Sequence, residues 1–315
     1  MSEQMILLCP GQGAQAVGMG KAWTEASPEA RAVLDRADEV LSGEPLGGGD
    51  RPLSALCFDG PEDQLNRTDV AQPAIYAASV ASLAGLRADA GAGAGELPLA
   101  ATAGLSLGEY TALHVAGAIS FEDGLKLVAL RGRAMQDAAE AQPSGMVALI
   151  GADEAQAREL CEKATLDAEV LVPANFNAPG QVVVSGHTGS CARAVDVAEE
   201  MGLRATALAV AGAFHSPLMA PAADRLRSAL ESVEIREPRV PVYSNVTASA
   251  HEGPDSIRAR LVEQLTEPVR WADCCLAMLT AHTGAAPHEL APGKTLAGLM
   301  RRIDRGAKVV SHDGP

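Results

Sequence analysis

The sequence has few aromatic residues and no long apolar run. Aromatic side chains make up only 3% of the 315 residues, although hydrophobic residues reach 47%. The core must therefore be filled by Ala, Val, Leu and Gly, which suits an alanine-rich α/β protein. No stretch approaches the roughly 18 apolar residues that a membrane helix needs. The apolar run at residues 5–9 is too short for a signal peptide and lacks a basic flank, so we expect a cytoplasmic protein without a membrane partner.

Cysteine and basic residues are also scarce. Six cysteines are present: Cys9, Cys57, Cys161, Cys191, Cys274 and Cys275. They form no CxxC pair and no zinc-type spacing with histidine, so we expect free, buried thiols, a reducing compartment and no metal. The chain has 25 basic against 40 acidic residues, a formal net charge of -15. This charge argues against nucleic acid and anionic membranes as partners.

Short apolar runs bounded by Gly or Pro alternate with helical patterns along the chain. This alternation is typical of βα units around a mostly parallel sheet. The expected strands are residues 5–9, 101–105, 146–150, 170–173, 181–185, 206–210 and 240–243. Residues 42–52 and 88–98 are rich in glycine and are interpreted as surface loops that carry no chemistry.

The pattern changes in the middle of the chain. Short β-rich runs there surround two helical patterns, at residues 154–164 and 189–201. Their β-α-β-β-α-β order predicts a small ferredoxin-like α+β subdomain at residues 142–212. We expect it to be inserted into a large α/β-hydrolase-like domain with a mostly parallel sheet, made of residues 1–141 and 213–315.

The strongest motif is Gly104-Leu105-Ser106-Leu107-Gly108, which follows an expected strand and opens a helical pattern. A G-x-S-x-G motif in a strand-turn-helix context indicates a nucleophile elbow. The glycines allow a tight turn, and the helix start directs N–H groups and a positive dipole end toward the serine. Ser106 is therefore the predicted nucleophile. A plain Gly/Ser turn between a strand and a helix is the structural alternative.

A serine nucleophile needs a base, and His215 is the best placed of the seven histidines because it enters a loop at the end of an expected strand. Taken alone, His215 would more often be an ordinary hydrogen-bonded histidine, but its pairing with the elbow favours the role of base. Residues 10–15, which follow the first expected strand, match neither a Walker A nor a dinucleotide motif. We expect the backbone N–H groups of Gln12 and Leu107 to stabilise an oxyanion, with a plain βα turn as the alternative for this loop.

These segments together resemble the malonyl-CoA:acyl carrier protein transacylases of fatty acid synthesis and, more distantly, the acyltransferase domains of polyketide synthases. The resembling segments run along nearly the whole chain, at residues 10–15, 59–62, 68–73, 104–110, 130–136, 175–186, 212–217, 241–246, 264–271 and 292–294. The resemblance implies transfer of a malonyl group from malonyl-CoA to the phosphopantetheine thiol of acyl carrier protein. The reaction would be ping-pong, through a malonyl ester on Ser106, in fatty acid or polyketide synthesis.

The resemblance also implies roles for individual residues. Ser106 would be acylated with His215 as its base, and Gln12 and Leu107 would form the oxyanion hole. Arg131 matches the arginine that holds the malonyl carboxylate, a role that suits a guanidinium because it can make two parallel charge-assisted hydrogen bonds. From the residues alone, Arg131 is interpreted as a solvated helix charge.

Three further positions are implied in the same way. Gln264 would orient the catalytic histidine through its backbone carbonyl, in place of an aspartate. Phe214 and Gln72 would contact the substrate, and Phe214 would fill the space that a methyl-branched acyl group needs, which is compatible with core packing. Leu105 is a departure, because many relatives have histidine directly before the nucleophile.

The implied reaction needs coenzyme A thioester as substrate but no metal or redox cofactor, and we expect a monomer. The partner acyl carrier protein is acidic in this family, so binding requires a local basic cluster. Lys294, Arg301 and Arg302 are the candidate set, with a solvated helix face as the alternative. Two other functions stay open: an esterase or thioesterase of the α/β-hydrolase type, which would need an acid residue and an HGGG-type loop, and a non-catalytic scaffold that binds carrier protein.

Overall fold

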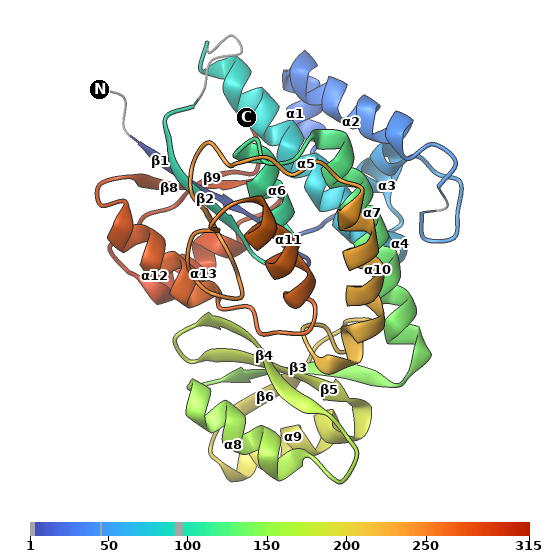
Figure 1. Cartoon of the computed structure of the whole chain (residues 1–315), viewed down its shortest axis with the longest axis vertical. Helices are drawn as coiled ribbons and strands as arrows, with labels where there is room; N and C mark the ends of the chain where they lie inside the picture. Colours follow the sequence, from blue (N-terminus) through green and yellow to red (C-terminus); the bar gives the residue numbers. More distant parts are fainter. Residues whose placement is uncertain (1–3, 45, 92–96) are drawn as a thin grey trace.

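The computed structural model describes residues 4–44, 46–91 and 97–315. Residue 45 and residues 92–96, which belong to the two expected surface loops, lie outside the described residues, as do residues 1–3. Figure 1 shows a larger upper domain, which carries both ends of the chain, and a smaller domain below it.

The larger domain is built on a five-stranded sheet in the order β7-β2-β1-β8-β9, and every pairing in it is parallel. The strands are β1 (Met5–Cys9), β2 (Leu99–Gly104), β7 (Val242–Tyr243), β8 (Ala286–Leu290) and β9 (Val310–His312). Strands β8 and β9 were not expected from the sequence. Strand β8 contains Pro287, His288 and Glu289, and these residue types do not mark a strand by apolar alternation.

Helices cover both faces of this sheet. Those of the larger domain are α1 (Lys21–Ala26), α2 (Pro28–Val40), α3 (Leu53–Asp59), α4 (Glu62–Leu65), α5 (Thr68–Asp89), α6 (Gly108–Val115), α7 (Phe121–Ala141), η1 (Pro217–Met219), α10 (Ala220–Glu231), α11 (Pro254–Glu263), α12 (Trp271–Ala281) and α13 (Thr295–Ile303). Successive side chains of a strand point to opposite faces. Leu7 and Cys9 of β1 accordingly join the core with α5 and α7, whereas Ile6 and Leu8 join the core with α12 and α13.

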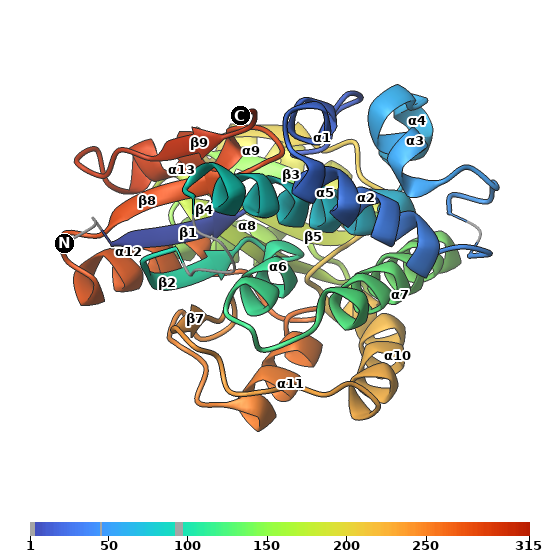
Figure 2. The ribbon, with the colours of Figure 1, turned by 90° about the horizontal axis from the view of Figure 1, so that it is seen from above.

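The two helical layers are also visible from above. Figure 2 shows α2, α5 and α7 gathered on one side of the strands, away from α12. A parallel sheet that is buried on both faces needs strands without polar alternation, and the apolar run of β1 meets that requirement. The expected fold class, an α/β domain with a parallel sheet and a small second sheet, is confirmed.

The smaller domain contains an antiparallel sheet in the order β4-β5-β3-β6. Its elements are β3 (Ser144–Ile150), α8 (Glu154–Ala164), β4 (Leu171–Ala178), β5 (Gln181–His187), α9 (Thr188–Glu200) and β6 (Arg204–Ala207). The β-α-β-β-α-β succession agrees with the sequence prediction. Strand β6 begins earlier than expected, however, and residues 208–210 form a loop that faces a cavity.

The two faces of the small sheet have different neighbours. Val147 and Leu149 pack against α8 and α9, whereas Met146 and Val183 join the core of the larger domain. Figure 1 accordingly shows the small sheet between its own helices and the larger domain. The contact includes backbone hydrogen bonds, because Asn175 of β4 forms a parallel bridge with Val269 of the larger domain.

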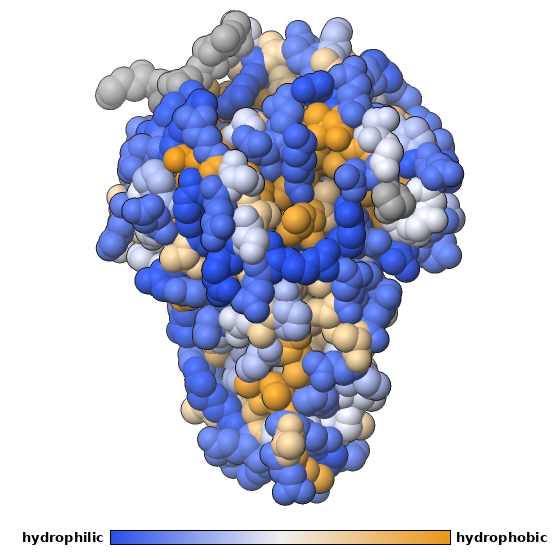
Figure 3. All heavy atoms as spheres, turned by 45° about the vertical axis from the view of Figure 1, so that its right-hand side comes forward, coloured by the Kyte–Doolittle hydropathy of each residue, from blue (hydrophilic) through white to orange (hydrophobic). Residues whose placement is uncertain are grey.

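The surface is polar over most of the face seen in Figure 3, where apolar residues form separate patches. Among the described residues, no helix is long and apolar enough to cross a membrane. All six cysteines are free and buried, as the sequence predicted.

Candidate active site

Ser106 lies at the turn between β2 and α6, with a backbone φ of 51°. A positive φ is strained for a residue with a Cβ atom, so the turn holds the serine in an unusual conformation. The flanking glycines are needed for close packing. A Cβ atom on Gly104 would lie 1.9 Å from the carbonyl carbon of Gly108, and one on Gly108 would lie 2.1 Å from the carbonyl oxygen of Cys9. The motif therefore folds as the expected elbow.

The loop after β1 lies beside this elbow because β1 and β2 are adjacent parallel strands, and the carboxyl ends of parallel neighbours meet at one edge of the sheet. The N–H group of Leu105 donates to the carbonyl of Cys9 over 3.1 Å. Among the described residues, no acceptor is found for the backbone N–H groups of Gln12 and Leu107. Two donors near the nucleophile are therefore available to a ligand.

His215 contacts Ser106 directly. Its Nε2 lies 2.9 Å from the Oγ of Ser106, and its Nδ1 lies 2.6 Å from the backbone carbonyl oxygen of Gln264. A carbonyl can only accept, so Nδ1 carries the proton and Nε2 is free to accept from the serine hydroxyl. Burial and the nearby Arg131 lower the pKa of His215 to about 4. The imidazole is therefore neutral at pH 7, as a general base must be.

Arg131 extends from α7 into the same centre and is only 1% exposed. Its Nη2 donates to the Oγ of Ser106 over 3.0 Å and to the Oε1 of Gln264 over 2.9 Å, while Nη1 donates to the Oε1 of Gln72 over 2.7 Å. Among the described residues, no carboxylate lies within 4.0 Å of its guanidinium and Nε has no acceptor. Burial lowers the pKa of Arg131. A buried cation without a direct counter-ion is suited to bind an anion.

Behind Ser106, His215 and Arg131 lies a buried hydrogen-bond network that sequence reasoning missed. Glu109, fully buried on α6, accepts from the backbone N–H of Asn245, from the Nε2 of Gln264 and from the Nε2 of His251. Asn245 in turn accepts from the N–H of Ser106 over 2.6 Å. The only signal in the sequence was position, because Glu109 and Asn245 lie in segments that carry the family resemblance.

The site opens into a cavity of about 580 Å³ between the two domains. Its lining includes Gln12, Leu105, Ser106, Arg131, Phe214 and His215. Gln72 and Gln264 do not line it and instead contact Arg131 from behind. Met146 and Val183 of the small sheet complete the wall, so both domains contribute to the site.

Two of the three basic residues expected to bind a partner adjoin this cavity. Lys294, Arg301 and Arg302 are exposed on or next to α13. Thr295 of the same helix lines the cavity, and Arg302 donates to Gln181, another lining residue, over 3.2 Å. Lys294, which precedes Thr295, and Arg302 are therefore next to residues that line the cavity.

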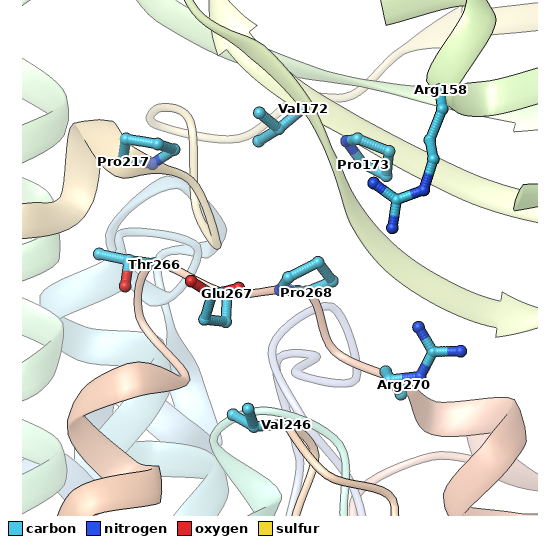
Figure 4. Close-up of a pocket in the computed structure, with 9 residues that line it drawn as sticks. All are labelled: Arg158, Val172, Pro173, Pro217, Val246, Thr266, Glu267, Pro268 and Arg270. Atoms are coloured by element: carbon cyan, nitrogen blue, oxygen red, sulfur yellow. The ribbon is translucent and has the colours of Figure 1, made fainter.

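A second cleft, of about 390 Å³, lies at the junction of the two domains (Figure 4). Arg158 and Arg270 stand at one end of it and Thr266 at the other. Both guanidiniums contact Glu154, over 2.7 Å and 3.4 Å. None of the site residues expected from the sequence lines this cleft, so the chemistry belongs to the larger cavity.

Comparisons with known proteins agree with this geometry. The acyl transferase domain family matches residues 6–306. The malonyl CoA-acyl carrier protein transacylase of Bacillus subtilis is 38% identical over 318 residues, which cover 99% of this chain and 94% of that protein. The crystal structure of a malonyl-CoA:acyl carrier protein transacylase from Xanthomonas oryzae has a TM-score of 0.90 at 40% identity and covers 100% of this chain and 96% of that one.

A further solved structure holds a malonyl-transacylase in complex with a type II polyketide synthase acyl-carrier protein. It has a TM-score of 0.89 at 36% identity and covers 99% of this chain and 96% of that one. Both the sequence and the fold thus match these transacylases along the chain. The chain also has a serine at a strand-turn-helix elbow in contact with a histidine. The chain belongs to the acyl transferase family, within its branch of malonyl-CoA:acyl carrier protein transacylases.

Proposed function

We propose that the protein transfers a malonyl group from malonyl-CoA to the phosphopantetheine thiol of an acyl carrier protein, in fatty acid or polyketide synthesis. The single observation that carries the proposal is the contact between Arg131 and Ser106. A buried guanidinium lies 3.0 Å from the oxygen that would become acylated, so an acyl group on Ser106 has a cation within reach of its far end. Malonyl, which ends in a carboxylate, satisfies that cation.

The first half-reaction forms an ester on Ser106. Its Oγ attacks the thioester carbonyl carbon while the proton moves to the Nε2 of His215. The backbone N–H groups of Gln12 and Leu107 stabilise the oxyanion. When the tetrahedral intermediate collapses, the carbon–sulfur bond breaks and the coenzyme A sulfur takes the proton from Nε2. The free thiol leaves, and the malonyl group remains esterified to the serine.

The second half-reaction reverses these steps with another thiol. The phosphopantetheine thiol gives its proton to His215, and its sulfur attacks the ester carbonyl. The carbon–oxygen bond breaks and the oxygen of Ser106 regains the proton. The carbonyl of Gln264 holds the imidazole in one tautomer throughout, and it stabilises the imidazolium that forms transiently.

Arg131 would bind the malonyl carboxylate. Among the described residues, the guanidinium donates hydrogen bonds only to neutral side-chain oxygens. It also lies over the ring of Tyr110, and its Nε has no acceptor. A carboxylate would supply both the missing charge and the missing acceptor. Phe214, in the cavity wall, would limit the space beside the α-carbon of the acyl group.

The carrier protein would approach over the basic cluster. Three exposed cations, Lys294, Arg301 and Arg302, lie on or next to α13 in a chain whose net charge is -15. Lys294 and Arg302 adjoin residues that line the cavity containing Ser106. An acidic partner would be steered there by charge. The proposed steps need no metal or redox cofactor. A cytoplasmic location and a monomeric state remain predictions.

The proposal is tested by intact-protein mass spectrometry. Purified protein mixed with malonyl-CoA should gain the mass of one malonyl group, and the phosphopantetheine form of an acyl carrier protein should then remove it and gain the same mass. Acetyl-CoA should give much less adduct at equal concentration. Release of malonate to water at the same rate with and without carrier protein would instead identify a thioesterase.

A further inference from the structure

Glu109 is a buried carboxylate that the proposed reaction does not use. It lies on α6, three residues after the nucleophile, and its side chain is fully buried. It does not touch His215, whose Nδ1 contacts a carbonyl, and it is not within 4.0 Å of Arg131. Burying a carboxylate costs free energy unless hydrogen bonds compensate the charge. Glu109 has three hydrogen-bond donors around it, and the residues that supply them indicate what this carboxylate holds in place.

Two of the three donors belong to the residues that hold Ser106 and His215, namely Asn245 and Gln264. One oxygen of Glu109, Oε2, accepts from the backbone N–H of Asn245 over 3.0 Å and from the Nε2 of Gln264 over 2.7 Å. Asn245 fixes the elbow, because its side chain bonds the N–H of Ser106 and the carbonyl of Gly104. Gln264 holds His215, because its backbone carbonyl accepts a hydrogen bond from the Nδ1 of that histidine.

The contact with Gln264 also decides which way its amide points. A carboxylate only accepts hydrogen bonds, and a guanidinium only donates them. The Nε2 of Gln264 must therefore face Glu109, which leaves Oε1 to accept from the Nη2 of Arg131 over 2.9 Å. If the amide were reversed, its NH₂ group would meet the guanidinium, donor against donor. Glu109 thus determines the orientation of a side chain that contacts the substrate-binding arginine.

His251 completes the arrangement. Its Nε2 donates to the other oxygen of Glu109, Oε1, over 2.9 Å, and both side chains are fully buried. This bond satisfies the oxygen that neither Asn245 nor Gln264 reaches. It leaves Oε2 directed at those two donors, so His251 fixes the rotation of the carboxylate.

We propose that Glu109 is a positioning residue for the transfer reaction, which acts through Gln264 to hold His215 and Arg131 in their reactive geometry, with His251 as its anchor. This inference rests on the proposed function. Acylation of the unaltered protein by malonyl-CoA tests that function separately, so the two can fail independently.

The first experiment measures the rate of the acylation half-reaction in Glu109→Gln. An amide at this position has only one acceptor oxygen for three donors, so its NH₂ group must face either His251 or Gln264. The acylation rate with malonyl-CoA should fall tenfold or more. Glu169→Gln is the matched control, because Glu169 also accepts hydrogen bonds from three residues (Leu166, Ser190 and Arg193) in the smaller domain, and its rate should stay within twofold.

The decisive comparison is made in a Gln264→Ala background. If Glu109 acts through Gln264, Glu109→Gln should cost less than threefold once the amide is gone. If Glu109→Gln instead impaired folding in general, its fold-loss in acylation rate would be the same with and without Gln264. The double variant would then show the product of the two single losses, and that result would overturn the proposal. His251→Phe serves as a second variant should Glu109→Gln not fold. It should slow acylation at least threefold with Gln264 present, and less than twofold without it.

A spectroscopic signature provides an independent readout. The Nδ1 proton of His215, in a 2.6 Å hydrogen bond to the Gln264 carbonyl, should give a downfield proton resonance. That resonance should move in Glu109→Gln and stay in Glu169→Gln. An unchanged resonance in folded Glu109→Gln would show that the carboxylate does not hold the imidazole, and it would overturn the proposal.

Discussion

Arg131 donates a hydrogen bond to the Oγ of Ser106 over 3.0 Å, so the residue proposed to bind the substrate also touches the nucleophile. This contact links specificity to reactivity. A buried cation beside the serine favours negative charge on its oxygen, and it disfavours a proton on the neighbouring His215, whose pKa it helps to lower. Arg131 therefore affects both the nucleophile, Ser106, and its proposed base, His215.

The contact predicts a reversal of acyl selectivity. In Arg131→Ala, malonyl transfer should fall by about a hundredfold or more, because a charge-assisted bidentate pair is lost, whereas acetyl transfer should hold steady or rise. Arg131→Lys keeps the positive charge but loses the paired N–H donors of the guanidinium, so the loss of malonyl transfer should be intermediate. Competition between malonyl-CoA and acetyl-CoA, followed by mass spectrometry of the acylated protein, measures the ratio. Equal losses for both substrates would mean that Arg131 supports the fold or the nucleophile and does not bind the malonyl carboxylate.

The nucleophile assignment predicts that Ser106→Ala abolishes acylation while the fold persists. Alanine has the same Cβ atom as serine, so the conformation at φ 51° should cost no more than before. The melting temperature should stay within a few degrees, and no malonyl adduct should form. His215→Ala should slow acylation by about a hundredfold or more, as expected for a lost general base. A malonylated alanine variant would refute the assignment of Ser106.

The lowered pKa of His215 predicts activity well into the acidic range. Only the neutral imidazole can accept the serine proton, so the rate falls as pH drops through the pKa of this group. An ordinary histidine titrates near pH 6.5, whereas burial and Arg131 lower the pKa of His215 to about 4. The single-turnover acylation rate should therefore stay level from pH 8 to about 5 and decline toward pH 4.

Circular dichroism at each pH would separate this decline from unfolding. In Arg131→Ala one cause of the lowered pKa is gone, so the acid limb of the profile should move to higher pH. A limb that stays near pH 6.5 in the unaltered protein would contradict the proposed state of the imidazole.

The basic cluster predicts a salt-dependent effect on carrier protein. Reversing Lys294, Arg301 and Arg302 to Glu should lower kcat/KM for carrier protein by about tenfold or more at low ionic strength, and the difference should shrink as salt screens the charges. Lys163→Glu is the control, since Lys163 lies on α8 in an exposed pair with Glu159. Unchanged apparent affinity at both low and high salt would remove the cluster from consideration.

The elbow at Ser106 and the first strands could be predicted because their signals are local. The elbow motif and the apolar runs of β1 and β2 lie within a few residues of the features that they specify. Strand β8 could not be predicted this way. Its Glu289 is buried because the carboxylate accepts from the N–H groups of Leu296 and Ala297 at the start of α13, and a strand residue with that task breaks the apolar pattern.

The network behind the site escaped prediction for a different reason. Glu109 and Asn245 are 136 residues apart in the sequence, and they meet because β7 pairs with β2 at the edge of the sheet. That pairing involves only Val242 and Tyr243 in β7, too short a run to establish strand order from the sequence. The side chain of His251 is buried although Glu252 and Gly253 follow it in the sequence, because its burial depends on this same tertiary contact.

The bridge between Asn175 and Val269 has a practical consequence for exchanging parts between related enzymes. The N–H group of Phe176 donates to the carbonyl of Val269 over 2.8 Å, and that of Val269 donates to the carbonyl of Ala174 over 2.9 Å. Backbone hydrogen bonds thus join the small sheet to the segment that begins at Gln264. A chimaera that replaces only the inserted subdomain would pair a foreign strand β4 with the native segment around Val269. Residues 264–270 should therefore be exchanged together with the small sheet.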